Sequence, residues 1–449
     1  MKKFRLISFI FYVLTSGLFI GLYAQNPIIR NQFTADPTAR IFNGKVYLFP
    51  SHDIPAPERF LRKDWFCMED YHVFSSSNLT EWTDHGVIVS QYNVNWVDTN
   101  SFSMWAPDCV ERNGKYYFYF PANVNAKYGK GFTIGVAIAD KPEGPYIPQP
   151  EPIKGVRGID PCVLIDRDGQ AYLYYSLNRI FVAKLKENML ELDSEPAVIA
   201  NLPAKGLIEG PFVFERNGIY YLTYPHVENK TERLEYAIAD SPMGPFKVAG
   251  VIMDESPTGC WTNHHSIVEY NGQWYLFYHH NDYSPKFDKN RSARIDSLFF
   301  NADGTIRKVV PTLRGVGLTL ARDRIEIDRY SQISDKGVSL AFIDTLNIFK
   351  GWKIRLGVQN SWVKYNSVDF ESKKVKSVSV RALSQAGSVL QIKVDGVNGI
   401  LLGEVKIPAG AEWATIRGRI KNSPKGVHHL VVLLKGDNPV EVDWVQFGD

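Results

Sequence analysis

The chain has 449 residues, of which 45% are hydrophobic and 22% charged, so it has enough apolar sequence to form sizeable cores. This composition excludes a disordered, collagenous or low-complexity protein. The four cysteines are too few for a disulfide-stapled scaffold of this length, and the formal net charge of +3 is small.

The excess of positive charge lies at the N-terminus. Residues 1–5 are basic, residues 6–23 are almost wholly apolar, and Ala24 offers a small residue for cleavage. This pattern predicts a secretory signal peptide over residues 1–24, with an uncleaved membrane anchor as the alternative. Lys2, Lys3 and Arg5 account for the excess, so the remaining chain is neutral and favours neither nucleic acid nor, after cleavage, a membrane as partner. The leader predicts a secreted or periplasmic protein.

One strand pattern recurs five times along residues 25–322. Each copy opens with Asn-Gly or Asp-Gly and continues with alternating aromatic and apolar residues, as in residues 113–119. The turn glycines, spaced by about 50 to 70 residues, are Gly44, Gly114, Gly169, Gly218 and Gly272. Such dipeptides between apolar runs are strong hairpin signals. Repeated hairpins without helical periodicity predict an all-β fold, with a five-bladed β-propeller over residues 25–322 in preference to a β-sandwich there.

An ionisable residue precedes each hairpin at an equivalent place. These residues are Asp36, Asp108, Asp160, Glu209 and His264. Equivalent positions of propeller blades lie on one ring, so we expect these side chains to converge at one end of the central channel. Converging carboxylates repel one another and are costly to desolvate, so such a cluster indicates a function. A metal cage is one interpretation; acid/base catalysis is the other, and carboxyl pairs with different pKa values hydrolyse glycosidic bonds.

The motifs around these residues resemble glycoside hydrolase family 43, a family of five-bladed propellers that comprises inverting glycosidases and arabinanases. The similar segments, within about residues 26–318, are Thr34-Ala35-Asp36-Pro37, Trp105-Ala106-Pro107-Asp108, Gly158-Ile159-Asp160-Pro161, Ile208-Glu209-Gly210-Pro211 and Asn263-His264-His265-Ser266. The resemblance implies that Asp36 is the general base and Glu209 the general acid. Asp160 would then orient Glu209 and keep it protonated through its nearby negative charge.

Further residues near these motifs are candidates for substrate binding. They are Phe33, Trp65, Trp105, Asp108, Trp261, His264 and Arg291. The aromatic side chains offer platforms for a sugar ring, with a place in the core as the alternative for each. Arg291 is a candidate partner of a sugar hydroxyl, or a surface arginine at a strand end. His264 matches the family histidine that sits over the channel, next to a bound calcium or a water, so it is also a candidate metal neighbour.

Residues 323–449 lack these motifs and show short alternating strands, which predict a β-sandwich of the jelly-roll type. Segments such as 325–328 and 442–447 resemble carbohydrate-binding module family 6. A structural calcium ion is common in that family, and the resemblance makes Glu326, Asp328 and Asp443 its candidate ligands, with plain surface carboxylates as the alternative. Trp352, Trp413 and Asn438 are candidates for a glycan cleft. The chemistry itself is expected to require no cofactor.

The resemblance predicts an inverting exo-glycosidase that releases terminal sugars from plant-type polysaccharide or oligosaccharide. An α-L-arabinofuranosidase is favoured, and a β-D-xylosidase or a galactose-directed enzyme of the same fold is the alternative. A non-catalytic glycan-binding protein is disfavoured by the three intact carboxylates. A retaining fructosidase is disfavoured because the first-blade motif has Ala35 and Thr38 in place of two asparagines. We expect a monomer whose four cysteines are buried apolar residues, with a Cys67–Cys109 disulfide as the alternative.

Overall fold

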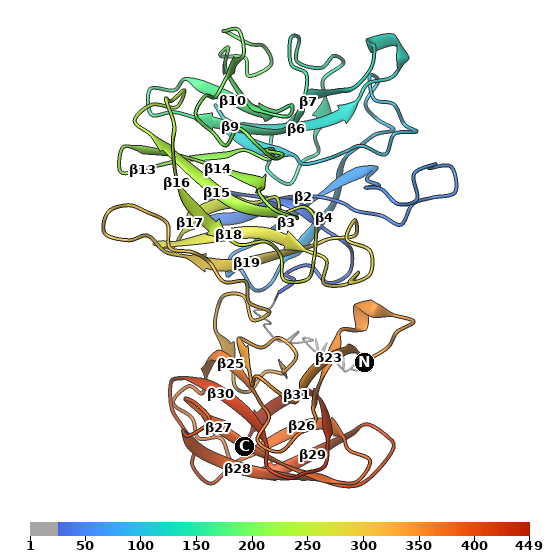
Figure 1. The fold of residues 1–449 in the computed structure, drawn as a ribbon, viewed down its shortest axis with the longest axis vertical. Coiled ribbons are helices and arrows are strands. Elements are labelled where there is room, and N and C mark those ends of the chain that lie inside the picture. Colours follow the sequence, from blue (N-terminus) through green and yellow to red (C-terminus); the bar gives the residue numbers. More distant parts are fainter. Residues whose placement is uncertain (1–25) are drawn as a thin grey trace, which may run out of the picture.

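A computed structural model of the protein describes residues 26–449. The predicted signal peptide, residues 1–24, lies outside the described residues. Figure 1 shows two bodies, one above the other: a propeller coloured from blue to yellow and a sandwich coloured from orange to red. The predicted fold class, an all-β propeller followed by a β-sandwich, is confirmed. Within residues 26–449, no helix is both long and apolar enough to cross a membrane.

The propeller consists of five antiparallel sheets in chain order within the described residues. Blade one contains β1 (Ala35–Phe42), β2 (Lys45–Ser51), β3 (Asp70–Ser76) and β4 (Thr83–Ser90). Blade two contains β5 (Asp108–Arg112), β6 (Lys115–Asn123), β7 (Phe132–Ala139) and β8 (Ile147–Pro148), with the 3₁₀ turn η1 (Ala126–Tyr128) between β6 and β7. Blade three contains β9 (Ile159–Ile165), β10 (Ala171–Ser176), β11 (Ile180–Leu185) and β12 (Ala197–Val198). Blade four contains β13 (Phe212–Arg216), β14 (Ile219–Val227), β15 (Glu232–Ala239) and β16 (Lys247–Met253). Blade five contains β17 (Ser266–Tyr270), β18 (Gln273–His280) and β19 (Ser292–Leu298).

The repeated dipeptides form the turns between the first two strands of each blade. In blade one, Asn43 and Gly44 both have positive φ, 50° and 72°. A two-residue turn of this kind needs positive φ at both positions, which asparagine and glycine tolerate best. The first strands of the blades contact one another in order, and β17 contacts β1 to close the ring. The residues just before each first strand therefore meet at one end of the channel.

The N-terminal segment completes the closure. The Asn26 side chain bonds both the N–H and the C=O of Ile295 on β19, at 2.8 and 3.0 Å. Further along, the backbone N–H of Thr34 donates to the C=O of Arg291. Residues 26–34 therefore tie the last blade to the first strand of the chain, so the two ends of the propeller sequence stabilise each other.

The sandwich is built from one mixed and one antiparallel sheet packed over a buried aliphatic core. The first sheet contains β20 (Thr319–Leu320), β22 (Gln332–Ile333), β25 (Trp362–Asp369), β27 (Ser388–Val394), β28 (Ile400–Ile407) and β30 (Val427–Leu434). The second contains β21 (Ile325–Glu326), β23 (Val338–Phe342), β24 (Trp352–Leu356), β26 (Ser377–Leu383), β29 (Ala414–Arg419) and β31 (Val440–Gly448). The 3₁₀ turn η2 (Ile348–Lys350) precedes β24. Strand β20 lies before the predicted boundary at residue 322 but already pairs with β25 of the sandwich.

Aromatic side chains join the two bodies. Tyr283 of the propeller stacks on Trp352 of the sandwich, with ring centroids 4.5 Å apart. Phe33 packs in the same cluster, against Phe349. Arg329 spans the junction and donates to the C=O of Asn26 at 2.6 Å. These contacts bury large apolar surfaces between the domains and so favour a fixed arrangement.

Candidate active site

A cavity of about 220 Å³ lies where the residues preceding the blades converge. Its ionisable lining residues are Asp36, Asp160, Glu209, Glu232, His264 and Arg291. Its aromatic lining residues are Trp65, Phe66, Trp105 and Trp261. Trp65, Trp105 and Trp261 thus lie where sequence analysis predicted a sugar platform, while Glu232 was not predicted. The pocket combines apolar walls with a few converging polar groups, as ligand sites do.

Asp36 begins blade one in a strained backbone conformation. Its φ is +46° although it precedes a proline, a combination that non-glycine residues rarely adopt. Its backbone N–H donates to His279 Nδ1 at 3.0 Å, and its Oδ1 accepts from Arg291 Nη1 at 2.9 Å. Strain of this kind persists where surrounding contacts hold it, and it occurs often at functional sites.

The environment of Asp36 favours its ionised form. Burial by itself raises the pKa of the Asp36 carboxyl, but the Arg291 guanidinium and two nearby histidines outweigh burial and hold the pKa below its ordinary value. One of those histidines is His264, whose Nδ1 lies 3.8 Å from Asp36 Oδ1. Asp36 is therefore a carboxylate that can accept a proton.

Arg291 is fixed by a second aspartate. Its Nε and Nη2 donate to the two oxygens of Asp53 at 2.9 and 2.8 Å, and its backbone N–H donates to Asp53 at 2.7 Å. Nη1 donates to Asp36 and Thr262. Its contacts with Asp36 and Asp53 make Arg291 a positioning residue for Asp36. Arg291 also lines the pocket, and its contact with a sugar hydroxyl stays a prediction.

Asp160 also has a positive φ, +56°, before a proline. Its Oδ2 accepts from Ser176 Oγ and from the backbone N–H of Gly210, both at 2.9 Å. Burial raises its pKa to about 7; His264 opposes the rise and Glu209 adds to it. Asp160 therefore holds the backbone next to Glu209.

A side chain at Gly210 would be strained in this arrangement. Its φ is +51°, and an added Cβ would meet two atoms of Pro225 at 3.0 Å and His264 Cε1 at 3.3 Å. The absence of a side chain at Gly210 thus lets the chain turn tightly beside His264, while the Gly210 N–H donates to Asp160.

Glu209 faces a second carboxyl group, that of Glu232 at the start of β15. Burial raises the pKa of Glu209 well above its ordinary value, and the charge of Glu232 and a hydrogen bond to it raise the pKa further. The same hydrogen bond lowers the pKa of Glu232, although burial leaves it at about 7. Glu232 Oε2 accepts the Asn263 N–H at 2.7 Å. The interaction between the two groups thus favours the proton on Glu209 rather than on Glu232.

The site thus holds an ionised Asp36 and a protonated Glu209. Two carboxyl groups whose surroundings push their pKa values apart are suited to act as base and acid in one reaction. The neighbouring charges that raise the pKa of Glu209 are Glu232 first and then Asp36. The charge of Asp160, which was predicted to keep Glu209 protonated, also interacts with Glu209, and Asp160 bonds the Gly210 backbone as well.

Comparison with known proteins identifies the family of this chain. The profile of glycosyl hydrolases family 43 matches residues 24–306, and that of carbohydrate binding module (family 6) matches residues 333–449. The chain belongs to glycosyl hydrolases family 43. Both resemblances stated from the sequence are confirmed, and the protein is a glycoside hydrolase.

Several curated proteins are similar in sequence to this family-43 chain. A xylosidase/arabinosidase 43A from Humicola insolens is 40% identical and covers 62% of this chain and 98% of its own. A xylosidase/arabinosidase from Bacteroides ovatus is 35% identical, covering 62% and 95%. An arabinoxylan arabinofuranohydrolase from Paenibacillus polymyxa is 25% identical and covers 94% of this chain and 74% of its own.

Solved structures show the same fold. A β-xylosidase/α-arabinofuranosidase from a compost microbial metagenome, solved with xylotriose in a calcium-free form, has a TM-score of 0.58. It is 36% identical and covers 64% of this chain and 98% of its own. An arabinoxylan arabinofuranohydrolase from Bacillus subtilis covers 94% of this chain and 97% of its own at 24% identity and a TM-score of 0.54, which shows that the two-domain fold recurs.

Two residues predicted to bind sugar lie elsewhere in this family-43 protein. Phe33 is buried in the cluster between the two domains, where its ring packs against Phe349 of the sandwich. Asp108 is 1% exposed and accepts from Arg40 Nε at 2.9 Å and from the Val163 N–H at 2.6 Å. It thus ties the inner strands of blades one, two and three together. Both predictions are corrected: equivalent sequence positions can point along the ring as well as into the channel.

The cysteines and His265 have structural positions. All four cysteines are buried and unpaired within the described part of the chain, so the Cys67–Cys109 disulfide is not formed. His265 is fully buried and its Nε2 lies 2.6 Å from Thr223 Oγ1, which links blades four and five.

The candidate calcium ligands come together only in part. Asp443 hydrogen-bonds with Glu326, and burial together with the Glu326 charge raises the pKa of Asp443 to about 7. Asp443 Oδ1 is buried and finds no hydrogen-bond partner among residues 26–449. Asp443 Oδ2 lies 3.2 Å from Arg381 Nε and 3.6 Å from Arg324 Nη2, so two guanidinium groups compete with any cation for this carboxylate. Asp328 pairs instead with Arg329 at 3.1 Å, and within residues 26–449 neither these three carboxylates nor His264 belongs to a cluster of metal-ligand size. The ion pair with Arg329 argues against Asp328 as a ligand, whereas the prediction that His264 neighbours a calcium ion or a water stays a prediction. Trp352 is corrected as a cleft residue, because it is buried against Tyr283.

Sequence analysis missed Glu232 and Asp53. Glu232 lies two and four residues before the buried Leu234 and Tyr236 on β15, so its side chain points to the same face of the strand. This orientation can be derived only when the bounds of the strand are known. Asp53 follows a strand end, as many surface aspartates do. Neither belongs to the repeated motif, and only the closed ring brings them beside Glu209 and Arg291.

Proposed function

We propose that the protein is an inverting exo-glycosidase that releases terminal pentose residues, α-L-arabinofuranose and β-D-xylose, from xylan-type substrates. The observation that carries the proposal is the contrast between Asp36 and Glu209. Asp36 acts as general base, since Arg291 keeps it ionised. Glu209 acts as general acid, since burial and Glu232 keep it protonated.

The proposed reaction is a single displacement. Asp36 takes a proton from a water that attacks the anomeric carbon, while Glu209 gives its proton to the departing glycosidic oxygen. The bond from the anomeric carbon to the leaving oxygen breaks as the bond to water forms, and the anomeric configuration inverts. Asp36 then loses its added proton to solvent, and Glu209 regains a proton from solvent. No cofactor takes part.

The cavity supports exo action on small terminal sugars. Its volume of about 220 Å³ lies below the roughly 300–1,000 Å³ of sites for drug-sized ligands. A single sugar ring suits such a space, with Trp105 and Trp261 as apolar walls. The relatives named xylosidase/arabinosidase favour both pentoses over galactose, because they cover the propeller at 35–40% identity.

The predicted leader over residues 1–24 supports a secreted or periplasmic location for this activity, where polysaccharide is met. The C-terminal domain is proposed as an accessory carbohydrate-binding module, supported by its family-6 match.

The test is hydrolysis of aryl α-L-arabinofuranoside, β-D-xyloside and β-D-galactoside by the exported chain. We expect release from the first two and little from the third. NMR of the sugar first released should show the inverted anomer. If folded protein hydrolyses none of the three substrates, the proposed function is contradicted. If the released sugar keeps the anomeric configuration of the substrate, the inverting mechanism is contradicted. Oligosaccharide binding without hydrolysis would instead identify a glycan-binding protein.

A further inference from the structure

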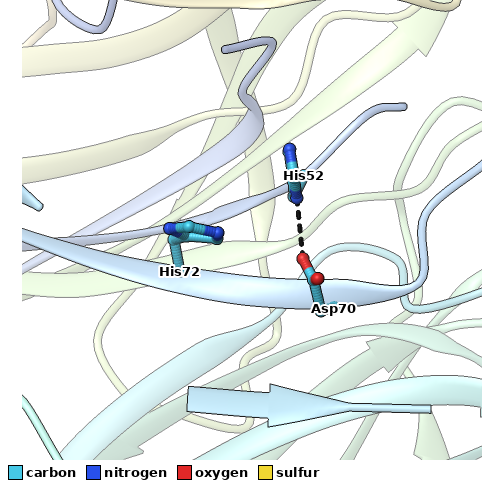
Figure 2. A group of neighbouring side chains, drawn as sticks. All are labelled: His52, Asp70 and His72. Atoms are coloured by element: carbon cyan, nitrogen blue, oxygen red, sulfur yellow. Dashed lines mark hydrogen bonds and ion pairs between the residues drawn. The ribbon is translucent and has the colours of Figure 1, made fainter. Parts of the chain in front are cut away.

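Blade one carries a cluster of metal-ligand side chains outside the pocket. His52, Asp70 and His72 lie together there, and their candidate ligand atoms are all within 4.8 Å of one another. Figure 2 shows His52 pointing at Asp70, with the His72 ring beside them. We propose that these three side chains form a binding site for a divalent transition-metal ion such as zinc.

The strand register explains why the three side chains share one face. Strands β2 and β3 are antiparallel with Ser51 opposite Tyr71, so the next position, His52, stands across from Asp70. His72 follows Asp70 by two residues and therefore points to the same side of the sheet. Tyr71, between them, is fully buried on the other side. Backbone geometry thus brings the donors together before any side chain moves.

The distances are close to those of a metal site. His52 Nδ1 lies 2.7 Å from Asp70 Oδ1, and the His52 and His72 rings are 5.0 Å apart and nearly perpendicular. Zinc bonds of about 2.0–2.2 Å place tetrahedral ligands about 3.4 Å apart. Small side-chain rotations therefore suffice, and the ion takes the place of the proton between His52 and Asp70. That proton leaves to the other ring nitrogen or to solvent.

A fourth residue supports His72. Asp84 on β4 has its two oxygens 3.0 and 3.2 Å from His72 Nδ1. A carboxylate on one imidazole nitrogen orients the ring and leaves the other nitrogen, Nε2, for a metal. Two carboxylates and two neutral imidazoles carry a charge of about −2, which matches a divalent cation.

The donor types select the ion. Two of the three ligands are imidazole nitrogens, which suit zinc, copper or nickel, whereas calcium and magnesium prefer all-oxygen sites. The side chains of His52 and His72 are 18% and 15% exposed, so an ion can enter from solvent and keep a water as its remaining ligand. The site is therefore distinct from the candidate calcium ligands of the sandwich.

The experiment is a zinc titration of the full chain after treatment with a chelator, followed by calorimetry. We expect one equivalent to bind to the wild type, and cobalt at the same site to give a visible tetrahedral spectrum. His52→Ala and His72→Ala should each weaken this binding by at least about 10–100-fold. Asp70→Asn keeps the shape and a hydrogen bond to His52 but loses the anionic oxygen, so it should weaken binding similarly if an alanine variant fails to fold.

Two matched controls locate the ion. His85→Ala removes an exposed histidine of the same blade, whose Nε2 faces Ser75, and should leave zinc affinity unchanged. His428→Ala removes a histidine of the sandwich that pairs with Asp395, and should also leave it unchanged. Zinc should raise the melting temperature of the wild type but not of His72→Ala. Absence of binding at millimolar zinc, equal affinity in the His72→Ala variant, or stronger binding of calcium would each overturn the proposal.

Discussion

The Glu209 and Glu232 carboxyl groups both line the pocket, where burial and then the charge of Glu232 raise the pKa of Glu209 well above its ordinary value. Two carboxyl groups in contact cannot both ionise at low cost, so one proton stays with the pair. Both groups line the cavity, but Glu232 is held by the Asn263 N–H and is 1% exposed, whereas Glu209 is only half-buried. The proton therefore rests on the group that reaches substrate.

Replacing Glu232 should move the alkaline limb of the pH–rate profile. In Glu232→Gln the negative charge is lost and an amide N–H can face Glu209, so the ionised form of Glu209 becomes more favourable and its pKa falls. Glu209 then loses its proton at lower pH, and the alkaline limb of kcat/KM shifts to lower pH. Glu235→Gln, a buried glutamate of the same strand that faces His226, serves as control and should not move that limb. An unchanged limb in Glu232→Gln would contradict the proposed proton sharing.

Arg291 should set the acidic limb. Its guanidinium lowers the pKa of Asp36, so Arg291→Lys, which cannot bond both Asp53 oxygens and Asp36 in the same way, should raise that pKa. Asp36 then becomes protonated at higher pH, and the acidic limb of kcat/KM moves to higher pH.

The control for Arg291→Lys is Arg294→Lys on β19, the strand that begins directly after Arg291. Arg294 is equally buried but pairs with Asp282, away from Asp36. It should lower stability without moving the acidic limb. Equal shifts in both variants would show that the effect comes from general loosening of β19.

The roles of Asp36 as base and Glu209 as acid should be distinguished by substrates with different leaving groups. Asp36→Ala and Glu209→Ala should each lower kcat by about 10²–10⁴-fold on a xylan oligosaccharide, since each removes one proton transfer. With a dinitrophenyl glycoside, whose leaving group needs no proton, Glu209→Ala should recover most of its rate and Asp36→Ala should not. The measurement is kcat on both substrates, with circular dichroism to confirm folding. Recovery by Asp36→Ala instead would reverse the assignment.

A substitution at Gly210 should lower both the stability of the protein and its activity. Gly210→Ala places a Cβ at 3.0 Å from Pro225 and 3.3 Å from His264 at a φ of +51°. We expect a loss of stability of about 1–3 kcal/mol together with lower kcat/KM, because Glu209 and the Asp160 contact shift. Gly259→Ala is the control, since Gly259 also has a positive φ, +76°, but has open space around its Cβ direction. Comparable kinetic losses in both variants would show that backbone strain alone explains the result.

The aromatic junction should stabilise the domain pair. Trp352→Ala removes the ring that stacks on Tyr283 and should cost about 3–5 kcal/mol in unfolding free energy. Trp413→Ala, on a half-buried ring of the same domain, should cost less. Denaturant unfolding measures both, and equal costs would contradict a special role of the junction.

The amino-acid sequence by itself determined the blades and most of the pocket. The Asn-Gly turns and alternating strands are local features, and repetition makes their combined signal specific. Asp36, Asp160, Glu209 and His264 could be placed in the pocket because equivalent positions of repeated blades meet on a ring.

Only the tertiary structure decided what each side chain faces. Asp108 and Phe33 share the sequence surroundings of pocket residues, yet one ties three blades together and the other packs against the sandwich. Glu232 and Asp53 lie outside the repeat, and closure of the ring brings them against Glu209 and Arg291. The physical reason is that pKa values depend on burial and on charges a few ångströms away, and those neighbours come from distant parts of the chain.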